Sequence, residues 1–483
     1  MTSLTQAQVE SIAARVVANL KARHPSAGTT LPGPARTKDP VAGPGAFPTV
    51  DLAVQAAQKA FQTLQGLTLE SRKHIIAAIR AAMTEAAEDL ARRAHEETGL
   101  GRTEDKVLKN HLVTEKTPGT EFIQPRVVTG DRGLTLTEYA PYGVIGAITP
   151  VTNPTSTIIC NTIGMVAAGN AVVFNVHPSA KRVSLYTVEL INRAIQQAGG
   201  PANLVTTVAE PTIESAQELM HHPGVRLLVV TGGAAVVKAA MRSGKRAICA
   251  GPGNPPVVVD ESADIEKAAA SIVRGASTDN NMVCVLEKEI IAVESIAFTL
   301  TSALARHGAL ILKEHELAAL EKVIFAEQRG PRTPAVMNKD YIGKDVQTIL
   351  ATIGIRAERD IRLAVAPVPE THPLVWTEQM MPVLPLVTVP TADQAIDLAK
   401  EAEHGFGHTA VMHSKNLDHL SRMAREMNCS IFVKNGPSLA GLGYGGEGYC
   451  SFSIASPTGE GLTSPVSFSR ERRCVLVDHF RIV

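Results

Sequence analysis

Apolar positions along most of the chain follow two alternating periods, one typical of helices and one typical of short buried strands. Helical spacing predicts helices over 50–65, 69–98, 156–168 and 182–197, with another that begins at Ala235. Runs rich in Val, Ile and Leu predict strands over 134–137, 144–148, 171–174, 204–208 and 227–230. Strands that alternate with helices in this way form a parallel, doubly wound α/β sheet. Such sheets bind nucleotides at the carboxyl ends of their strands.

A second α/β unit begins near Pro256. Strand patterns occupy 257–260, 290–293, 384–389, 409–412 and 430–433, and helical patterns occupy 265–274, 296–306 and 392–402. A glycine-dense stretch at 435–448 and a strand-like tail at 472–477 follow. We therefore expect two α/β domains, over 48–255 and 256–440, with residues 441–483 returning to the first.

The N-terminus has a pattern of its own. Thr5 can cap a helix, Gln8 can complete a capping box, and Leu4 and Val9 can form a hydrophobic staple. We predict an amphipathic helix over 1–24, tethered by a Pro- and Gly-rich linker over 25–47. This helix either packs on its own domain or docks into a partner's groove, and its tether favours docking. A membrane-surface role is disfavoured, because its apolar face has no Trp or Phe.

Composition excludes several classes of function. Lys and Arg number 47, as do Asp and Glu, so no basic excess is left to hold nucleic acid. Aromatic content of 4% gives few base-stacking platforms. No apolar run approaches the ~18 residues that a membrane span needs, and the N-terminus lacks a secretory signal. The six cysteines form no CxxC pair, which indicates reduced thiols, a cytosolic compartment and no metal site.

Two local features are candidates for chemistry. Cys284 stands between the polar segment 279–281 and the strand pattern that follows, where a thiol can face a cleft. Thr231-Gly232-Gly233 lies between a strand and a helix, where a glycine turn lets a phosphate approach backbone N–H groups. The alternatives are an inert core thiol and an ordinary tight turn. The chain contains no GxGxxG fingerprint.

Several further segments are informative because of their order along the chain. They are Asn153-Pro154-Thr155, Ala168-Gly169-Asn170, His177-Pro178-Ser179, the Thr231 turn, residues 251–256, residues 279–284, residues 378–382 and residues 457–461. Together they resemble the aldehyde dehydrogenase superfamily over 50–483, and its CoA-acylating branch in particular. With its N-terminal extension, the chain is most similar to the propionaldehyde dehydrogenases of bacterial microcompartments, in which such a helix directs encapsulation.

The resemblance implies an architecture. It implies a Rossmann-type NAD(H)/CoA-binding domain over 48–255, a catalytic domain over 256–440, and a small oligomerisation arm near 122–140 that pairs with a C-terminal strand in 441–483. It also implies a homodimer or homotetramer.

The resemblance implies roles for individual residues as well. Cys284 matches the nucleophile, and Asn153 matches the side-chain oxyanion donor beside the Cys284 N–H. Glu378 matches the residue that holds the nicotinamide ribose. The other expected cofactor contacts are Thr149, Pro150 and Val151 at the nicotinamide, His177, Pro178 and Ser179 at the adenosine ribose, Thr231, Gly232 and Gly233 at the pyrophosphate, and Ala250 and Gly251. Without the resemblance, Asn153 reads as a turn former and Glu378 as a surface acid.

Two departures from the hydrolytic relatives carry information. Ala250 stands where their water-activating glutamate stands, so the acyl group must pass to another acceptor. A thiol suits, because free thiols supply some thiolate near neutral pH without a strong base. His177 replaces a lysine that often contacts NAD, which leaves the choice of NAD or NADP open.

We therefore expect oxidation of a short-chain aldehyde, first of all propionaldehyde, with NAD and CoA, through a Cys284 thioester, inside a microcompartment of the bacterial cytoplasm. Acetaldehyde and lactaldehyde are alternative substrates. A hydrolytic semialdehyde dehydrogenase and a catalytically idle protein recruited to a shell through residues 1–24 are alternative functions. The sequence indicates no group that would lower the pKa of Cys284.

Overall fold

The computed structural model describes residues 43–358 and 360–483. The helix expected over 1–24 and most of the expected linker lie outside these residues. The prediction that the linker extends to residue 47 is wrong, because Ala46–Phe47 forms strand β1 and pairs with the strand that contains Thr207. A strand of two residues is too short to give an alternating pattern, so the sequence showed only linker composition here.

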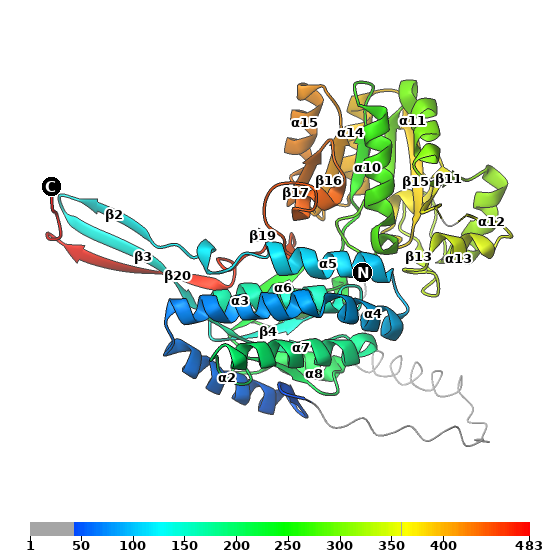
Figure 1. The fold of residues 1–483 in the computed structure, drawn as a ribbon. Helices are drawn as coiled ribbons and strands as arrows, with labels where there is room; N and C mark the ends of the chain where they lie inside the picture. Colours follow the sequence, from blue (N-terminus) through cyan, green and yellow to red (C-terminus); the bar gives the residue numbers. More distant parts are fainter. Residues whose placement is uncertain (1–42, 359) are drawn as a thin grey trace, which may run out of the picture. The chain divides into compact units, whose positions relative to one another are not determined.

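The first half of the chain builds a six-stranded parallel sheet in the order β1-β6-β5-β4-β7-β8 (Figure 1). Its other strands are β4 (Val144–Ile148), β5 (Ala171–Asn175), β6 (Val205–Val208), β7 (Leu227–Thr231) and β8 (Ala247–Ala250). Every residue of β4, β5 and β6 is buried, as expected for a sheet covered on both faces. The predicted parallel sheet is confirmed.

Eight helices accompany this sheet within the described residues. They are α2 (Val50–Gln65), α3 (Leu69–Glu85), α4 (Ala87–Thr98), α5 (Thr103–Lys116), α6 (Pro154–Ala167), α7 (Lys181–Gln197), α8 (Ile213–His221) and α9 (Ala234–Met241). The single helix predicted over 69–98 is therefore wrong: Ala86 ends α3 and begins α4. Buried apolar positions continue on both sides of Ala86, so the pattern of the sequence does not reveal the break.

The strand order changes direction between β4 and β7. The chain runs from β4 through β5 to β6 on one side, then crosses to β7 and β8 on the other. Right-handed crossovers then place α6 and α7 on one face of the sheet and α8 and α9 on the opposite face. A reversal of this kind leaves a crevice outside the carboxyl ends of the two central strands, and ligands bind there.

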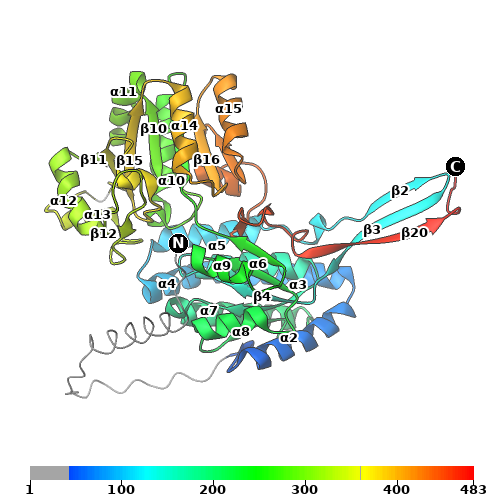
Figure 2. The same ribbon diagram turned by 180° about the vertical axis from the view of Figure 1, so that it is seen from behind.

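The second half of the chain builds a seven-stranded parallel sheet in the order β11-β14-β15-β10-β9-β16-β17. Its strands are β9 (Pro256–Val259), β10 (Glu289–Val293), β11 (Ala309–Ile311), β14 (Leu363–Pro367), β15 (Val383–Val389), β16 (Thr409–His413) and β17 (Ile431–Lys434). The sequence predicted all of these except β11 and β14, which occupy one edge. Figure 2 shows this sheet between its helices.

The remaining elements are short or cover the second sheet. The helices are α10 (Ile265–Ser277), α11 (Glu294–Arg306), α12 (Glu314–Ile324), α13 (Val346–Ala351), α14 (Ala392–Ala402) and α15 (Leu417–Met427). The single turns of 3₁₀ helix are η1 (Thr120–Phe122), η2 (Pro178–Ala180), η3 (Thr278–Asn281), η4 (Pro373–Trp376) and η5 (Ser438–Leu442). Two small hairpins pair β12 (Phe325–Glu327) with β13 (Val336–Met337) and β18 (Ile454–Ala455) with β19 (Gly461–Leu462).

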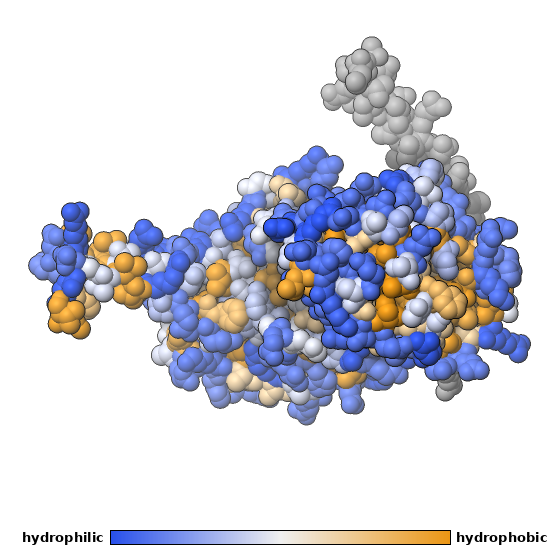
Figure 3. All heavy atoms as spheres, turned by 90° about the horizontal axis from the view of Figure 1, so that it is seen from above, coloured by the Kyte–Doolittle hydropathy of each residue, from blue (hydrophilic) through white to orange (hydrophobic). Residues whose placement is uncertain are grey.

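A three-stranded antiparallel arm extends from the sheets in both ribbon views (Figures 1 and 2). It consists of β2 (Arg126–Gly130), β3 (Gly133–Pro141) and the C-terminal β20 (Ser469–Val477), with β3 in the middle. The predicted arm near 122–140 and the predicted C-terminal strand therefore pair with each other. Apolar side chains gather on this arm (Figure 3), where Val128 is 71% exposed and Val475 is 56% exposed.

No helix among the described residues is long and apolar enough to cross a membrane.

Candidate functional site

Four of the expected cofactor-binding segments meet at the carboxyl edge of the first sheet. They follow β5, β4, β7 and β8, which are successive neighbours in the sheet. Ile148 at the end of β4 is level with Asn175 of β5 and Val230 of β7, and Thr231 is level with Ala250. The structure therefore places residues 149–151, 177–179, 231–233 and 250–251 along one edge, at the reversal of strand order.

This edge offers groups that suit a nucleotide. Gly233 is the N-cap of α9, and apart from its chain neighbours no heavy atom lies within 4 Å of the point where a Cβ would stand, so there is space beside the helix N-terminus. The Thr149 hydroxyl is buried without a hydrogen-bond partner. Nδ1 of His177 accepts a hydrogen bond from the Ser179 N–H (3.2 Å), so a neutral ring carries its proton on Nε2. Burial lowers the pKa of His177, which favours this neutral form.

The candidate catalytic residues gather at the amino edge of the second sheet. Cys284, Glu378 and His408 precede β10, β15 and β16, and Gly253 precedes β9. These four strands are successive neighbours, in the order β15-β10-β9-β16. Residues 251–255 join the end of β8 to the start of β9, and so connect the two edges over at most about 20 Å.

Gly253 packs closely against Cys284 and His408 at this edge. A Cβ on Gly253 would stand 3.1 Å from the Cys284 carbonyl oxygen and 2.9 Å from Cγ of His408. Any side chain at position 253 would therefore displace the segment that carries the thiol. Of the expected pair Ala250 and Gly251, Ala250 ends β8 and is 4% exposed. Its methyl group can neither donate nor accept a proton.

Cys284 is partly exposed, and its surroundings favour the neutral thiol. Burial, and then the nearby Glu378 carboxylate, raise the pKa of Cys284 to about 12. The Lys288 ammonium and the backbone at Cys284 and Val285 act in the opposite direction. Burial also raises the pKa of Glu378, against the pull of Lys288 and of a hydrogen bond from the Gly253 backbone. Lys288 is thus a cation that acts to lower the pKa of Cys284, but burial outweighs it and the net shift is upward.

Lys288 also shapes the Cys284 segment. It is fully buried, and its ammonium donates to the Asn281 carbonyl (3.2 Å), to Oδ1 of Asn281 (2.5 Å) and to the Val283 carbonyl (3.3 Å). Burial lowers the pKa of Lys288, and the carboxylates around it oppose that shift. These three bonds fix the backbone on the N-terminal side of the thiol.

The turn before Cys284 has an unusual backbone. Asp279, Asn280 and Asn281 have φ values of 47°, 53° and 65°, in the left-handed region. Asp and Asn tolerate this region better than other non-glycine residues. Hydrogen bonds also hold each of the three side chains. Asn280 donates to the Gly343 carbonyl and to Asp345, Asn281 donates to the carbonyls of Ala276 and Glu287, and Asp279 pairs with lysines of α5.

Asn153 stands at the start of α6 and is 7% exposed. Its Oδ1 accepts a hydrogen bond from Nζ of Lys109 (2.6 Å), and its Nδ2 donates to Oγ1 of Thr152 (3.1 Å). Lys109 also pairs with Asp279. The expected oxyanion donor is therefore joined to the Cys284 turn through one buried lysine.

Sequence reasoning missed several of these residues. Lys109 and Lys288 carry no local signal, because their partners are distant in the sequence or lie on the backbone.

His408 is buried against Gly253, burial lowers its pKa to about 4, and its Nε2 has no hydrogen-bond partner. Glu289 is fully buried with both carboxyl oxygens unpaired, and burial raises its pKa well above the usual range. A lone charged residue in a strand pattern gave no indication of this.

The raised pKa of Cys284 predicts how the reactivity of its thiol depends on pH. The pKa of Cys284 lies well above neutral pH, so Cys284 is mostly a thiol there and its thiolate fraction grows tenfold per pH unit. We expect alkylation of Cys284 by iodoacetamide, followed by peptide mass spectrometry, to accelerate about tenfold per unit from about pH 7 to about pH 9. Glu378→Gln removes a charge that raises the pKa, so alkylation should be faster at each pH. A plateau below about pH 8 in the wild type would contradict this account.

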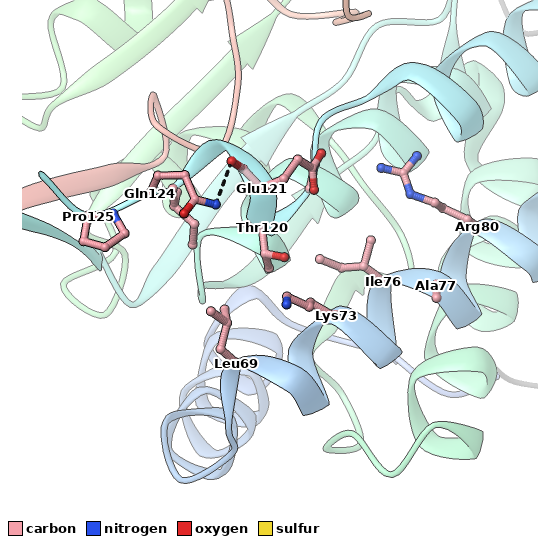
Figure 4. A pocket seen from close by; sticks show the side chains of 11 residues that line it. Leu69, Lys73, Ile76, Ala77, Arg80, Thr120, Glu121, Gln124 and Pro125 are labelled. Atoms are coloured by element: carbon pink, nitrogen blue, oxygen red, sulfur yellow. Dashed lines mark hydrogen bonds between the residues drawn. The ribbon is translucent and has the colours of Figure 1, made fainter.

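A separate pocket of about 420 Å³ lies between α3 and the segment around η1 (Figure 4). Lys73 and Arg80 of α3 and Glu121 of η1 line it, and it contains none of the expected site residues. The Arg80 guanidinium donates to the carbonyls of Thr114, Glu115 and Thr117, so it is occupied at the C-terminal end of α5. This pocket lies at the base of the arm, and neither Cys284 nor Glu378 lines it.

The described residues contain no cluster of His, Cys, Asp and Glu that could hold a metal ion.

Two curated proteins resemble the chain along most of their length. The acetaldehyde dehydrogenase (acetylating) EutE of Salmonella typhimurium is 49% identical over 442 residues, which cover 91% of this chain and 94% of EutE. The propanal dehydrogenase (CoA-propanoylating) of the same organism is 46% identical over 453 residues, covering 94% of this chain and 96% of that protein.

Solved structures extend the similarity to three dimensions. The propionaldehyde dehydrogenase of Rhodopseudomonas palustris, with bound CoA and an acylated cysteine, matches with a TM-score of 0.87 and 51% identity, over 90% of this chain and 98% of that one. A propionaldehyde dehydrogenase from the fucose utilisation microcompartment of Clostridium phytofermentans matches with a TM-score of 0.88 and 46% identity, over 91% and 100%.

The aldehyde dehydrogenase family model matches residues 45–317, which span the first sheet, the Asn153 segment and Cys284. The fold, the two full-length relatives and this match agree, and the chain therefore belongs to the aldehyde dehydrogenase family.

Proposed function

We propose that this protein oxidises a short-chain aldehyde with a nicotinamide cofactor and CoA to the corresponding acyl-CoA, through a thioester on Cys284. One observation carries the proposal. A partly exposed cysteine stands at the amino edge of the second sheet, while the expected position of a water-activating glutamate is the buried Ala250. The names of the full-length relatives, which are acetylating and CoA-propanoylating enzymes, support the same reaction.

Cys284 and Asn153 carry the first half of the reaction. The Cys284 thiol loses its proton to solvent, its thiolate attacks the aldehyde carbon, a C–S bond forms, and the carbonyl electrons move to oxygen. Nδ2 of Asn153 and the Cys284 N–H donate to the resulting oxyanion. When the electrons return and the C=O bond forms again, hydride leaves the carbon and an acyl thioester remains on Cys284. Bound NAD or NADP supplies the acceptor for that hydride.

The carboxyl edge of the first sheet would hold the nicotinamide cofactor. The open N-terminus of α9 at Gly233 suits the pyrophosphate, and the unpaired Thr149 hydroxyl suits a polar group near the nicotinamide. His177, Pro178 and Ser179 would face the adenosine ribose, and Glu378 the nicotinamide ribose. The neutral His177 offers no positive charge for a 2′-phosphate, so we assign NAD as the preferred cofactor.

CoA completes the reaction. Its thiolate attacks the thioester carbon, the bond to Cys284 breaks, and acyl-CoA and the Cys284 thiolate are released. One thioester replaces another, so the step requires no strong base. Ala250 leaves water without a proton acceptor at this position, which favours transfer to CoA over hydrolysis.

Propionaldehyde is the proposed substrate, and acetaldehyde is the closest competitor. One methylene in an apolar pocket is worth only about 1–3 kcal/mol of discrimination. The test is the ratio kcat/KM for two-, three- and four-carbon aldehydes and for lactaldehyde, each with NAD and NADP, with acyl-CoA and free acid both quantified. A higher ratio for acetaldehyde would overturn the assignment of propionaldehyde, and free acid as the main product would overturn the proposed reaction.

We further propose that residues 1–24 direct the enzyme into a bacterial microcompartment by docking on a shell or core protein. The microcompartment origin of the Clostridium structure supports this location. A reporter protein fused to residues 1–24 should colocalise with the shell. A reporter that stays diffuse while the full-length enzyme is encapsulated would refute the proposal.

The arm is the proposed oligomerisation surface, in a homodimer or homotetramer. Leu476 and Val477 of β20 and Val127 and Val128 of β2 are each at least 42% exposed, an unusual amount of apolar surface for three strands. We expect Leu476→Asp to lower the molecular mass in sedimentation or light-scattering measurements, and Asp131→Ala in the exposed turn between β2 and β3 to leave it unchanged. An unchanged mass for Leu476→Asp would exclude this surface.

A further inference from the structure

A buried cluster of two lysines and one aspartate links helix α5 to the turn before Cys284. Lys106, Lys109 and Asp279 are 3%, 1% and 0% exposed. Both ammonium groups bond to the same oxygen, Oδ2 of Asp279, with Lys106 at 3.0 Å. Charges buried this deeply are costly unless they are paired. The cluster therefore fixes the position of both lysines.

The two lysines differ in one contact. Lys109 donates a second hydrogen bond, of 2.6 Å, to Oδ1 of Asn153, whereas the hydrogen bond of Lys106 goes to Asp279. An ammonium group is a donor with no acceptor capacity. The end of the Asn153 amide that faces Lys109 must therefore be its oxygen, because a rotated amide would place N–H groups against the ammonium.

The orientation of this amide decides what Asn153 can do. With Oδ1 held by Lys109, the NH₂ group is on the other side of the amide, and only one of its two N–H groups is needed for Oγ1 of Thr152. The second N–H remains available to an oxyanion. A rotated amide would present a lone pair to that oxyanion and repel it.

We propose that Lys109 is a positioning residue for aldehyde oxidation: anchored by Asp279, it holds the oxygen of the Asn153 amide so that the NH₂ group faces the tetrahedral oxyanion on Cys284. This inference rests on the proposed role of Asn153. Lys109 also links the oxyanion donor to the Cys284 turn, since Asp279 belongs to that turn and Asn153 stands at the start of α6.

Lys109→Met and Lys106→Met form a matched pair, because each leaves one lysine on Asp279. We expect Lys109→Met to lower kcat by about 10- to 100-fold, somewhat less than the ~10²–10³-fold loss of Asn153→Ala. Lys106→Met should retain kcat within about threefold. The double variant Lys109→Met/Asn153→Ala should be no slower than Asn153→Ala, because the lysine acts through the asparagine.

Alkylation of Cys284 by iodoacetamide separates positioning from damage to the turn, since that reaction forms no oxyanion. We expect its rate in Lys109→Met to stay within about threefold of wild type. Equal losses of kcat in the two lysine variants, additive losses in the double variant, or a matching fall in alkylation would each overturn the proposal. If Lys109→Met does not fold, Lys109→Ala, which also has no donor, enters the same cycle under the same criteria. Wild-type kcat in Asn153→Ala would instead refute the oxyanion role itself, and the positioning role with it.

Discussion

Replacement of Cys284 by alanine is expected to abolish aldehyde-dependent NADH formation, with a loss of at least about 10⁴-fold. Of the other described cysteines, Cys160, Cys249 and Cys450 are buried, and the exposed Cys474 belongs to the arm. Cys429 is partly exposed before the edge strand β17, but two strands separate β17 from β10, and its thiol donates to the Ile431 carbonyl. Without the C–S bond, no tetrahedral intermediate forms and hydride has no route from the aldehyde carbon. The measurement is NADH absorbance with saturating propionaldehyde, NAD and CoA.

Controls distinguish this loss from misfolding. Cys284 is partly exposed, so removal of its sulfur leaves no sealed cavity, and the thermal unfolding midpoint should stay near that of the wild type. NAD binding, followed by quenching of Trp376 fluorescence or by calorimetry, should persist. Cys474→Ala is the matched thiol control and should retain full activity. Turnover by Cys284→Ala above about a hundredth of the wild-type rate would refute Cys284 as the acyl carrier.

The sequence predicted the strands well because both sheets are parallel and covered by helices. Their strands are short, buried on both faces and rich in Val and Ile, as in Val257, Val258 and Val259 of β9. Such runs stand out against the helical period of their neighbours. The expected glycine turn and the thiol also follow from local patterns, because the turn lies just after β7 and the thiol lies shortly before β10.

The geometry of the site could not be predicted, because it depends on contacts between distant parts of the chain. Lys109 and Asp279 are separated by 170 positions. Neither the helix that carries Lys109 nor the left-handed turn at Asp279 gives a local signal for the pairing. Glu289 and Lys288 lie in or beside a strand pattern, where a charged residue normally faces water. Here the packed sheet buries both.

The state of Cys284 also runs against simple expectation. A nucleophilic cysteine usually has a lowered pKa, yet burial and Glu378 raise the pKa of Cys284 to about 12. At neutral pH this pKa keeps Cys284 protonated as a thiol. A positive charge brought near Sγ by a bound ligand would lower that pKa, as Lys288 already does in part. Reactivity of the thiol is thus expected to depend on occupancy of the cofactor site.

Omission of CoA is expected to stop the enzyme after one turnover. With propionaldehyde and NAD alone, NADH should form in a burst of about one equivalent per subunit and then cease, because the acyl group stays on Cys284. Addition of CoA should restart turnover at once. Rapid-mixing absorbance measures the burst, and mass spectrometry of the intact protein should show the added acyl group.

Glu378 makes this a demanding test, because its carboxylate is close enough to raise the pKa of Cys284. Burial raises the pKa of Glu378 itself, so its carboxylate is a stronger base than that of a surface acid and is a candidate to activate water. Steady NADH formation with release of free acid in the absence of CoA would show that Glu378 or another group activates water. The reaction would then be hydrolytic. Glu378→Gln identifies the source, since it should remove such turnover if Glu378 is the base. Ala250→Glu supplies the opposite control, in which a carboxylate at the end of β8 should convert the stalled burst into slow hydrolysis.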